Sequence, residues 1–263
     1  MNLLEAIVLG IIQGLTEFLP VSSSGHLELG KYLFGIDHEA NFYFSIAVHG
    51  ATLLSTILVF RKDISDLLKG FFRFRMNDET KYILKIVISM IPVGIAGLFM
   101  NEIAEKYFAG NMISLGIEFL ITAFLLAMTL IIRPRERQMT YADSFVIGIA
   151  QAISVLPGIS RSGATIATGM MLGNKKSELA KFSFLIVIMP IIGANYLEST
   201  SGNFSKEGTS VIVIVAGFIT AFVTGYIACK WMISLVRKGN MRWFALYCVL
   251  VGIYSILLGL NVI

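Results

Sequence analysis

The chain has 263 residues, of which 56% are hydrophobic and 14% charged, and its mean hydropathy is +0.78. Soluble domains carry roughly 25% charged residues, so this composition excludes an ordinary soluble domain and predicts one compact membrane domain, residues 1–263. The net charge of +4 comes from basic residues that are not clustered on one soluble face, which argues against a nucleic-acid partner.

The chain begins with an apolar stretch, residues 1–35, that is interrupted by Pro20 and a run of serines. A helix needs about 20 apolar residues to cross a bilayer, and neither half is long enough. Three unbroken apolar runs follow, at 41–60, 82–100 and 112–132. The stretch 141–173 is broken like the first, and three more unbroken runs follow it, at 178–197, 209–229 and 241–262. We therefore predict an all-α polytopic membrane helix bundle with six full crossings and two re-entrant helix hairpins, whose broken backbone is covered by protein or water.

The distribution of Lys and Arg predicts which side of the membrane each loop occupies. If the six runs cross and the hairpins do not, one side receives almost all of the 21 basic residues, and the other side holds only Lys31, Lys106 and Lys206. Cytoplasmic loops carry the excess of Lys and Arg, so the basic side is cytoplasmic. Both termini then face outward, the first hairpin enters from outside, and the second enters from the cytoplasm.

The two broken stretches are related in sequence at an offset of 138 residues. Gly10-Ile-Ile-Gln13 falls on Gly148-Ile-Ala-Gln151, and the serines and glycine that follow also coincide. We therefore predict a first repeat over 1–132 and a second over 141–263. Three crossings separate the hairpins, and three is odd, so the second repeat is inverted. Inverted repeats with broken helices place their site near the midplane, at the repeat interface.

Polar residues concentrate at the two interruptions. Gln13 and Glu17 are four residues apart and share one helix face, and the serine run leads to His26. The second interruption carries Arg161 between two serines. A charged side chain at the bilayer centre costs roughly 2.5–3.5 kcal/mol, so a functional site is the default interpretation. Each serine-rich turn starts a half-helix whose free N–H groups favour an anion, and the guanidinium fork suits phosphate.

Purely structural interpretations are the alternative. Serine and glycine runs in membrane helices can serve close packing, His26 can be a hydrogen-bonded structural histidine, and Glu17 with Arg161 can be a structural ion pair. Several other polar or thiol-bearing residues are expected to have no chemical role. Glu118 is expected to extend from the outer end of its span toward the interface, His49 to be a core residue or a neighbour of the site, Asp37, His38 and Glu39 to form a solvated loop, and Cys229 and Cys248 to be core residues.

Residues 13–26, Gln-Gly-Leu-Thr-Glu-Phe-Leu-Pro-Val-Ser-Ser-Ser-Gly-His, resemble the first motif of the undecaprenyl-diphosphate phosphatases, the bacitracin-resistance type of bacterial membrane enzyme. Residues 157–165, Pro-Gly-Ile-Ser-Arg-Ser-Gly-Ala-Thr, resemble their second motif. The first position of the first motif is Glu or Gln in the family and Gln13 here. Length, span pattern and repeat agree, so the resemblance covers essentially the whole chain.

The resemblance implies hydrolysis of undecaprenyl diphosphate to undecaprenyl phosphate and inorganic phosphate. The product would be the carrier lipid that is reused in peptidoglycan synthesis, and the activity would be linked to bacitracin resistance. The expected compartment is the inner (plasma) membrane of a bacterium, with the chemistry on the outer side. The partners would be the polyprenyl diphosphate substrate and membrane lipid, and the sequence leaves a homodimer open.

Four residues are expected to carry the chemistry. Arg161 would clamp the pyrophosphate, Ser23 would be the nucleophile or would position water, His26 would act as acid and base, and Glu17 would orient a base or help to hold a cation. The expected pyrophosphate-binding residues are Gln13, Ser22, Ser24, Ser160, Ser162, Gly163 and Thr165.

The spacings of a dedicated metal site are missing, and no organic cofactor is expected. Mg²⁺ or Ca²⁺ would enter with the pyrophosphate, with Glu17 as its ligand. Two rival functions remain: a transporter or flippase of a polyprenyl phosphate lipid, because broken helices and inverted repeats are common there, and a scaffold with no chemistry.

Overall fold

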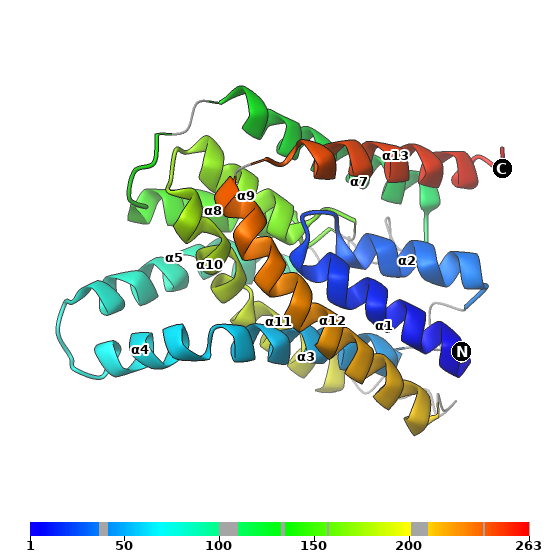
Figure 1. The fold of residues 1–263 in the computed structure, drawn as a ribbon, viewed down its shortest axis with the longest axis horizontal. Helices are drawn as coiled ribbons and strands as arrows, with labels where there is room; N and C mark the ends of the chain where they lie inside the picture. Colours follow the sequence, from blue (N-terminus) through cyan, green and yellow to red (C-terminus); the bar gives the residue numbers. More distant parts are fainter. Residues whose placement is uncertain are drawn as a thin grey trace.

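The computed structural model describes residues 1–36, 42–99, 110–132, 135–156, 158–200, 210–238 and 240–262. Every regular element in these ranges is a helix, which confirms the predicted all-α class (Figure 1). The helices are α1 (Leu3–Phe18), α2 (Ser23–Phe34), α3 (Phe42–Val59), α4 (Arg61–Phe71), α5 (Asp78–Phe99), α7 (Met112–Ile131), α8 (Tyr141–Ile153), α9 (Arg161–Met171), α10 (Lys176–Ile186), α11 (Ile188–Thr200), α12 (Val211–Lys238) and α13 (Arg242–Gly259). The expectations for Asp37, His38, Glu39, Lys106, Arg133, Pro157 and Lys206 lie outside the described residues.

Among the described residues, five helical segments are long and apolar enough to cross a membrane: α5, α7, α10 continued by α11, α12 and α13. A sixth is present if α3 and α4, which meet at a bend of 71°, are counted as one span. Each of the six predicted runs lies on one of these segments. The chain is therefore a multi-pass membrane protein.

Both predicted interruptions are present at the predicted places. α1 ends at Phe18, just before Pro20, whose ring removes a backbone donor and restricts the residue before it. Ser22 then caps α2, because its Oγ accepts a hydrogen bond from the Gly25 N–H at 3.2 Å. In the second stretch α8 ends at Ile153, and Ser160 caps α9 in the same way, with the Gly163 N–H at 3.0 Å.

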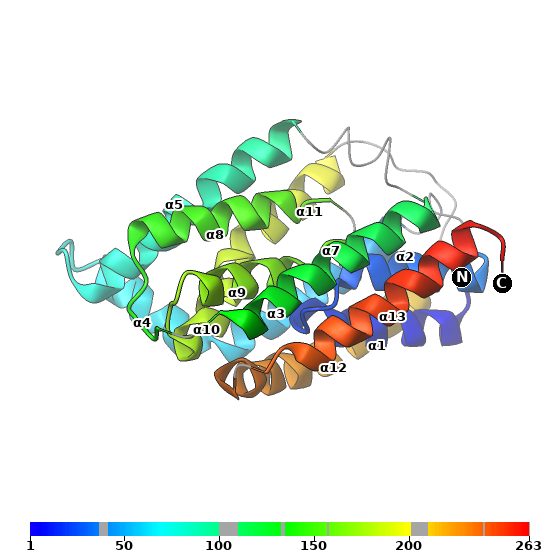
Figure 2. The ribbon, with the colours of Figure 1, turned by 90° about the horizontal axis from the view of Figure 1, so that it is seen from above.

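The two helix pairs approach the centre of the bundle from opposite ends. In Figure 1, α1 and α2 extend inward from the end that holds both termini, and Figure 2 shows α8 and α9 extending inward from the other end. The two turns therefore face one another in the middle of the molecule, where they are surrounded by the longer helices.

Glycine lets the first helix of each pair lie very close to a long helix. A Cβ atom at Gly10 would lie 2.1 Å from Thr220 Oγ1 of α12, and one at Gly148 would lie 2.3 Å from the Ser89 carbonyl of α5. Without side chains at these positions, α1 packs on α12 and α8 packs on α5. These contacts fix both short helices against elements that are long enough to span.

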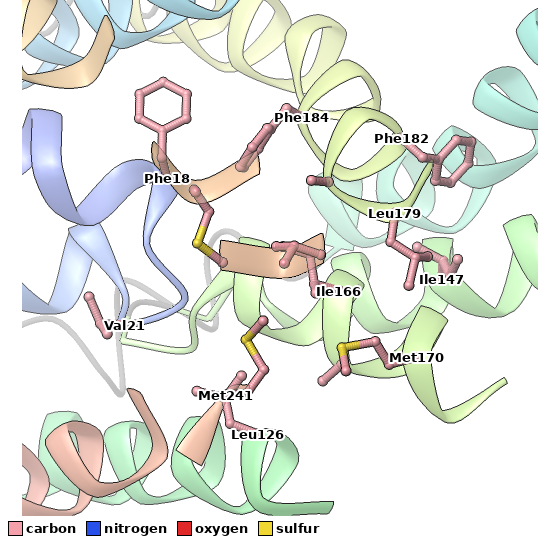
Figure 3. Close-up of a cluster of buried hydrophobic side chains, with 14 of the residues drawn as sticks. Phe18, Val21, Leu126, Ile147, Ile166, Met170, Leu179, Phe182, Phe184 and Met241 are labelled. Atoms are coloured by element: carbon pink, nitrogen blue, oxygen red, sulfur yellow. The ribbon is translucent and has the colours of Figure 1, made fainter. Parts of the chain in front are cut away.

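The main hydrophobic cluster connects the end of α1 to the second half of the chain (Figure 3). Phe18 contacts Phe184 edge to face, with ring centroids 5.4 Å apart, and Ile166 of α9 belongs to the same cluster. Cys229 and Cys248 are buried here as free thiols, which confirms that they are core residues. The cluster holds α9 and α10 against the turn after α1.

Candidate active site

One carboxylate connects the two helix pairs. Glu17 Oε1 accepts a hydrogen bond from Arg161 Nη2 at 2.9 Å, and Glu17 Oε2 accepts from Ser23 Oγ at 2.6 Å and from Gln13 Nε2 at 2.9 Å. The Glu17 side chain is 7% exposed and the Arg161 side chain 28% exposed. Four of the predicted site residues, from both interruptions, therefore meet in a largely buried cluster.

The local backbone explains why Ser23 reaches Glu17. Gln13 and Glu17 are one turn apart near the end of α1, so both lie on the same helix face. Ser22 has φ +71°, a conformation that is costly for a residue with a side chain. This reversal lets Ser23 begin α2 beside the helix that has just ended.

The second interruption is tied directly to the first. The Gly158 N–H donates to Ser24 Oγ at 3.2 Å, and Ser162 Oγ donates to the Leu19 carbonyl at 3.1 Å. These bonds place Arg161, the first residue of α9, opposite the last turn of α1. The two turns are therefore joined by direct hydrogen bonds.

Other predicted binding residues are engaged with the protein itself. The Ser160 N–H donates to Thr122 Oγ1 of α7 at 3.0 Å, and Ser160 Oγ caps α9. Thr165 Oγ1 lies 2.6 Å from Ser183 Oγ and donates to the Arg161 carbonyl at 2.9 Å. These side chains build and brace the turn around Arg161.

A narrow cavity with a volume of about 10 Å³ lies beside the Glu17–Arg161 pair. Its lining is Glu17, Phe18, Thr52, Thr56, Arg161, Ser162, Ser183, Phe184, Val187 and Ile191. Thr52 and Thr56 were not predicted as site residues, although two threonines one turn apart in an apolar run were the available signal. The cavity has a polar end at the ion pair and an apolar wall on α10 and α11.

The His26 ring contacts α7 and α13. Its Nδ1 lies 2.7 Å from the Ser22 carbonyl oxygen, and its Nε2 lies 2.7 Å from the Tyr247 hydroxyl. Within the described ranges no hydrogen bond joins His26 to Ser23. Tyr247 was not anticipated, because nothing in an apolar run marks which tyrosine faces a distant histidine.

Known proteins resemble the chain over nearly its whole length. Residues 6–254 match the family model of the bacitracin resistance protein BacA. The chain belongs to this family. A relative named undecaprenyl-diphosphatase from Bacteroides thetaiotaomicron is 49% identical, with 98% of this chain and 99% of the relative covered. Relatives of the same name from Parabacteroides distasonis and, as undecaprenyl-diphosphatase 1, from Bacillus cereus are 48% and 36% identical over at least 97% of each chain.

In this BacA-family chain, Glu118 does not extend toward the membrane interface. The expectation that it would do so was wrong, because the residue is 2% exposed and packs under the second turn. A Cβ atom at Gly158 would lie 2.2 Å from Glu118 Oε2. Neither carboxyl oxygen has a hydrogen-bond partner within the described residues. His49 is half-buried on α3, and its Nδ1 lies 2.8 Å from the Ser45 carbonyl oxygen.

The described residues hold no cluster of three or more His, Cys, Asp or Glu side chains that could bind a metal ion. The site nevertheless offers hard oxygen donors. Gln13 Oε1 is buried without a hydrogen-bond partner in the described structure, and it lies on the same helix face as the Glu17 carboxylate. Amide and carboxylate oxygens suit Mg²⁺ and Ca²⁺, so these two residues fit a cation that arrives with an anionic substrate.

Proposed function

We propose that this BacA-family protein hydrolyses undecaprenyl diphosphate to undecaprenyl phosphate and inorganic phosphate, the activity for which its relatives are named. The observation that carries the proposal is the cluster in which Glu17 accepts hydrogen bonds from both Ser23 and Arg161. The product is the carrier lipid for peptidoglycan synthesis, and its regeneration accounts for bacitracin resistance.

Ser23 is the nucleophile in this proposal, and Glu17 is its base. The Ser23 hydroxyl already donates to Glu17 Oε2 at 2.6 Å, so the carboxylate is placed to take the proton. Ser23 Oγ bonds to the terminal phosphorus, the bond from that phosphorus to the bridging oxygen breaks, and undecaprenyl phosphate leaves with the electron pair. After Glu17 has passed its proton to solvent, it accepts a proton from attacking water and returns one to Ser23 as phosphate departs.

Arg161 supplies the positive charge. Only its Nη2 is bonded to Glu17, so the remaining N–H donors of the guanidinium are available for phosphate oxygens. The hydroxyls of Ser22, Ser24, Ser160, Ser162 and Thr165 and the Gly163 N–H are bonded within the two turns, so their part is to hold the turns in place around the anion. Gln13 and Glu17 would hold Mg²⁺ or Ca²⁺, which neutralises phosphate charge when bound.

The proposal also covers the arrangement of the chain in the membrane. We propose six crossings, two re-entrant hairpins and an inverted repeat, with 1–132 as the first copy and 141–263 as the second. The equivalent caps at Ser22 and Ser160 and the equivalent packing of Gly10 and Gly148 support the repeat. The end with both termini faces outward, and the α1–α2 hairpin opens there (Figure 1).

The lipid tail lies along the apolar wall of the cavity, where Phe184, Val187 and Ile191 continue outward from the polar end. This places the diphosphate at the Glu17–Arg161 pair and the prenyl chain beside α10 and α11. The transporter alternative has no support from the relatives reported above, which are named as diphosphatases.

Phosphate release from undecaprenyl diphosphate by the purified wild-type chain in detergent micelles tests the proposal. Hydrolysis needs no bilayer and flipping does, so steady phosphate release in micelles is the expected result. Lipid movement in vesicles without phosphate release in micelles would favour the transporter instead.

A further inference from the structure

His26 is connected to the turn that carries Ser23 by its ring as well as by its backbone. The Ser22 carbonyl oxygen accepts from the His26 backbone N–H at 3.2 Å and lies 2.7 Å from His26 Nδ1. A carbonyl can only accept, so Nδ1 carries a proton. In the neutral ring Nε2 is then an acceptor, and the Tyr247 hydroxyl donates to it at 2.7 Å.

The ring is also fixed by packing. The His26 and Tyr247 rings are parallel within 5° at a centroid distance of 5.5 Å, and the Phe119 ring meets His26 edge to face at 5.1 Å. α7 and α13 run side by side in both views and supply these two contacts (Figures 1 and 2). The imidazole is therefore fixed in orientation between α2 and the pair α7 and α13.

A second contact from α13 reaches the same turn. Cys248, the residue after Tyr247, is buried with its Sγ 3.8 Å from the Pro20 carbonyl oxygen. Two consecutive residues of α13 thus contact both sides of the chain reversal at Ser22. Cys248 contacts Pro20 before the reversal, and Tyr247 contacts His26 after it. Ser22, between them, holds φ +71°, a conformation that a serine keeps only when its surroundings impose it.

We infer that Tyr247 and His26 are positioning residues for Ser23, and that His26 is not the acid–base group of the reaction. The Tyr247 hydroxyl selects the ring tautomer with hydrogen on Nδ1, and that hydrogen holds the Ser22 carbonyl in place. The fixed carbonyl maintains the reversal, and the reversal keeps Ser23 Oγ against Glu17 Oε2. This inference rests on the proposed hydrolase function.

The test compares substitutions of His26 that keep or remove the Nδ1 donor. In His26→Asn, the side-chain amide nitrogen takes the place of Nδ1 and can still donate to Ser22, whereas His26→Gln and His26→Ala do not restore that bond. The measurement is kcat and KM for phosphate release from undecaprenyl diphosphate across pH, on full-length protein in detergent, with thermal unfolding recorded for each variant.

We expect His26→Asn to keep kcat within about fivefold of wild type with an unchanged pH profile, since it loses only the Tyr247 bond. We expect kcat of His26→Gln and His26→Ala to fall by a further tenfold or more, which corresponds to the loss of about one to two hydrogen bonds. If all three variants lose activity equally and a limb of the pH profile disappears, His26 is the acid–base group and the inference is overturned.

Tyr247→Phe provides the second arm, because it removes one hydroxyl and keeps the ring. We expect kcat to fall about fivefold with little change in KM, and the loss to vanish in the His26→Asn background, where the acceptor is gone. Tyr254→Phe, on the same helix with a similarly exposed ring, is the matched control and should match wild type. A Tyr247→Phe variant with full kcat would overturn the inference, while a wild type that releases no phosphate would instead refute the proposed function.

Discussion

Arg161 Nη2 lies 2.9 Å from Glu17 Oε1, so the first residue of α9 is bonded to the last turn of α1. This ion pair spans 144 positions of sequence and joins two helix pairs that enter the bundle from opposite ends. A carboxylate this deeply buried needs a partner, and the guanidinium supplies one until an anionic substrate competes for it. The pair is therefore a structural link, and under the proposed function it is also a preformed anion site.

Replacement of Arg161 tests that double role. We expect Arg161→Ala to lower kcat/KM for phosphate release by about 100- to 1,000-fold, the usual effect of removing one donor to a developing charge. Arg161→Lys should be poor as well, because a point charge does not reproduce the fork. Folding should suffer less, since Glu17 keeps hydrogen bonds from Ser23 and Gln13. Arg242→Ala, which removes an exposed arginine on α13, is the control and should match wild type.

The Gly158 position tests how tightly the second turn is packed. Its φ of +100° disfavours any side chain, and a Cβ atom would meet Glu118 Oε2 at 2.2 Å. We expect Gly158→Ala to lower the free energy of unfolding by about 2–5 kcal/mol, the sum of backbone strain and overpacking.

Gly35→Ala is the matched control for that substitution. Gly35 also has positive φ, +63°, but a Cβ atom there meets nothing within 4 Å, so the cost should be about 1–2 kcal/mol. Chemical denaturation in detergent measures both variants. Equal losses in the free energy of unfolding for Gly158→Ala and Gly35→Ala would mean that the second turn can shift to accommodate a side chain.

Replacement of Glu118 should raise the free energy of unfolding, in contrast to replacement of Gly158. Its carboxyl group is buried, and no hydrogen bond reaches it within the part of the chain that the structure describes. Burial of a polar group without a partner costs about 1–3 kcal/mol, so Glu118→Leu should raise the free energy of unfolding by about that amount. Glu118→Gln has the same shape and stays polar, so it should gain much less. A loss of stability in the leucine variant would show that the carboxyl group has a partner in the membrane.

The proposed cation is tested by chelation. Excess EDTA should abolish phosphate release, and Mg²⁺ or Ca²⁺ should restore it, because the diphosphate needs its charge neutralised beside Glu17. Gln13→Ala should raise the Mg²⁺ concentration required for half-maximal rate, since it removes an oxygen donor next to Glu17. Full activity of the wild type in excess chelator would rule out the cation.

Several features of the fold could be predicted from sequence because their causes are local. Pro20 disfavours continuation of the preceding helix, and a serine such as Ser22 or Ser160 can cap the N-terminus of the helix that follows it. Both interruptions were therefore placed correctly. The pairing of Glu17 with Arg161 was predictable for a different reason. Two charges in apolar surroundings are stable only together, and a predicted inverted repeat brings the two turns to one place.

Other features depend on packing that local sequence does not encode. Glu118 and Tyr247 lie on long apolar helices, and the direction in which each side chain points is set by how α7 and α13 are rotated against the turns. The 71° bend between α3 and α4 could not be predicted, because the residue at the bend, Phe60, is neither proline nor glycine. Thr52 lines the cavity only because α3 lies beside α10 and α11 there.

The central claim is that groups from both turns act as one active site. The most direct test is the rate of phosphate release from undecaprenyl diphosphate by purified wild type, Ser23→Ala, Arg161→Ala and the double variant, side by side. Residues that work as a unit show strongly non-additive losses, so each single variant should fall by at least about 100-fold and the double variant should be no slower than the slower single variant. Near-wild-type release by either single variant, or losses that multiply in the double variant, would contradict the account.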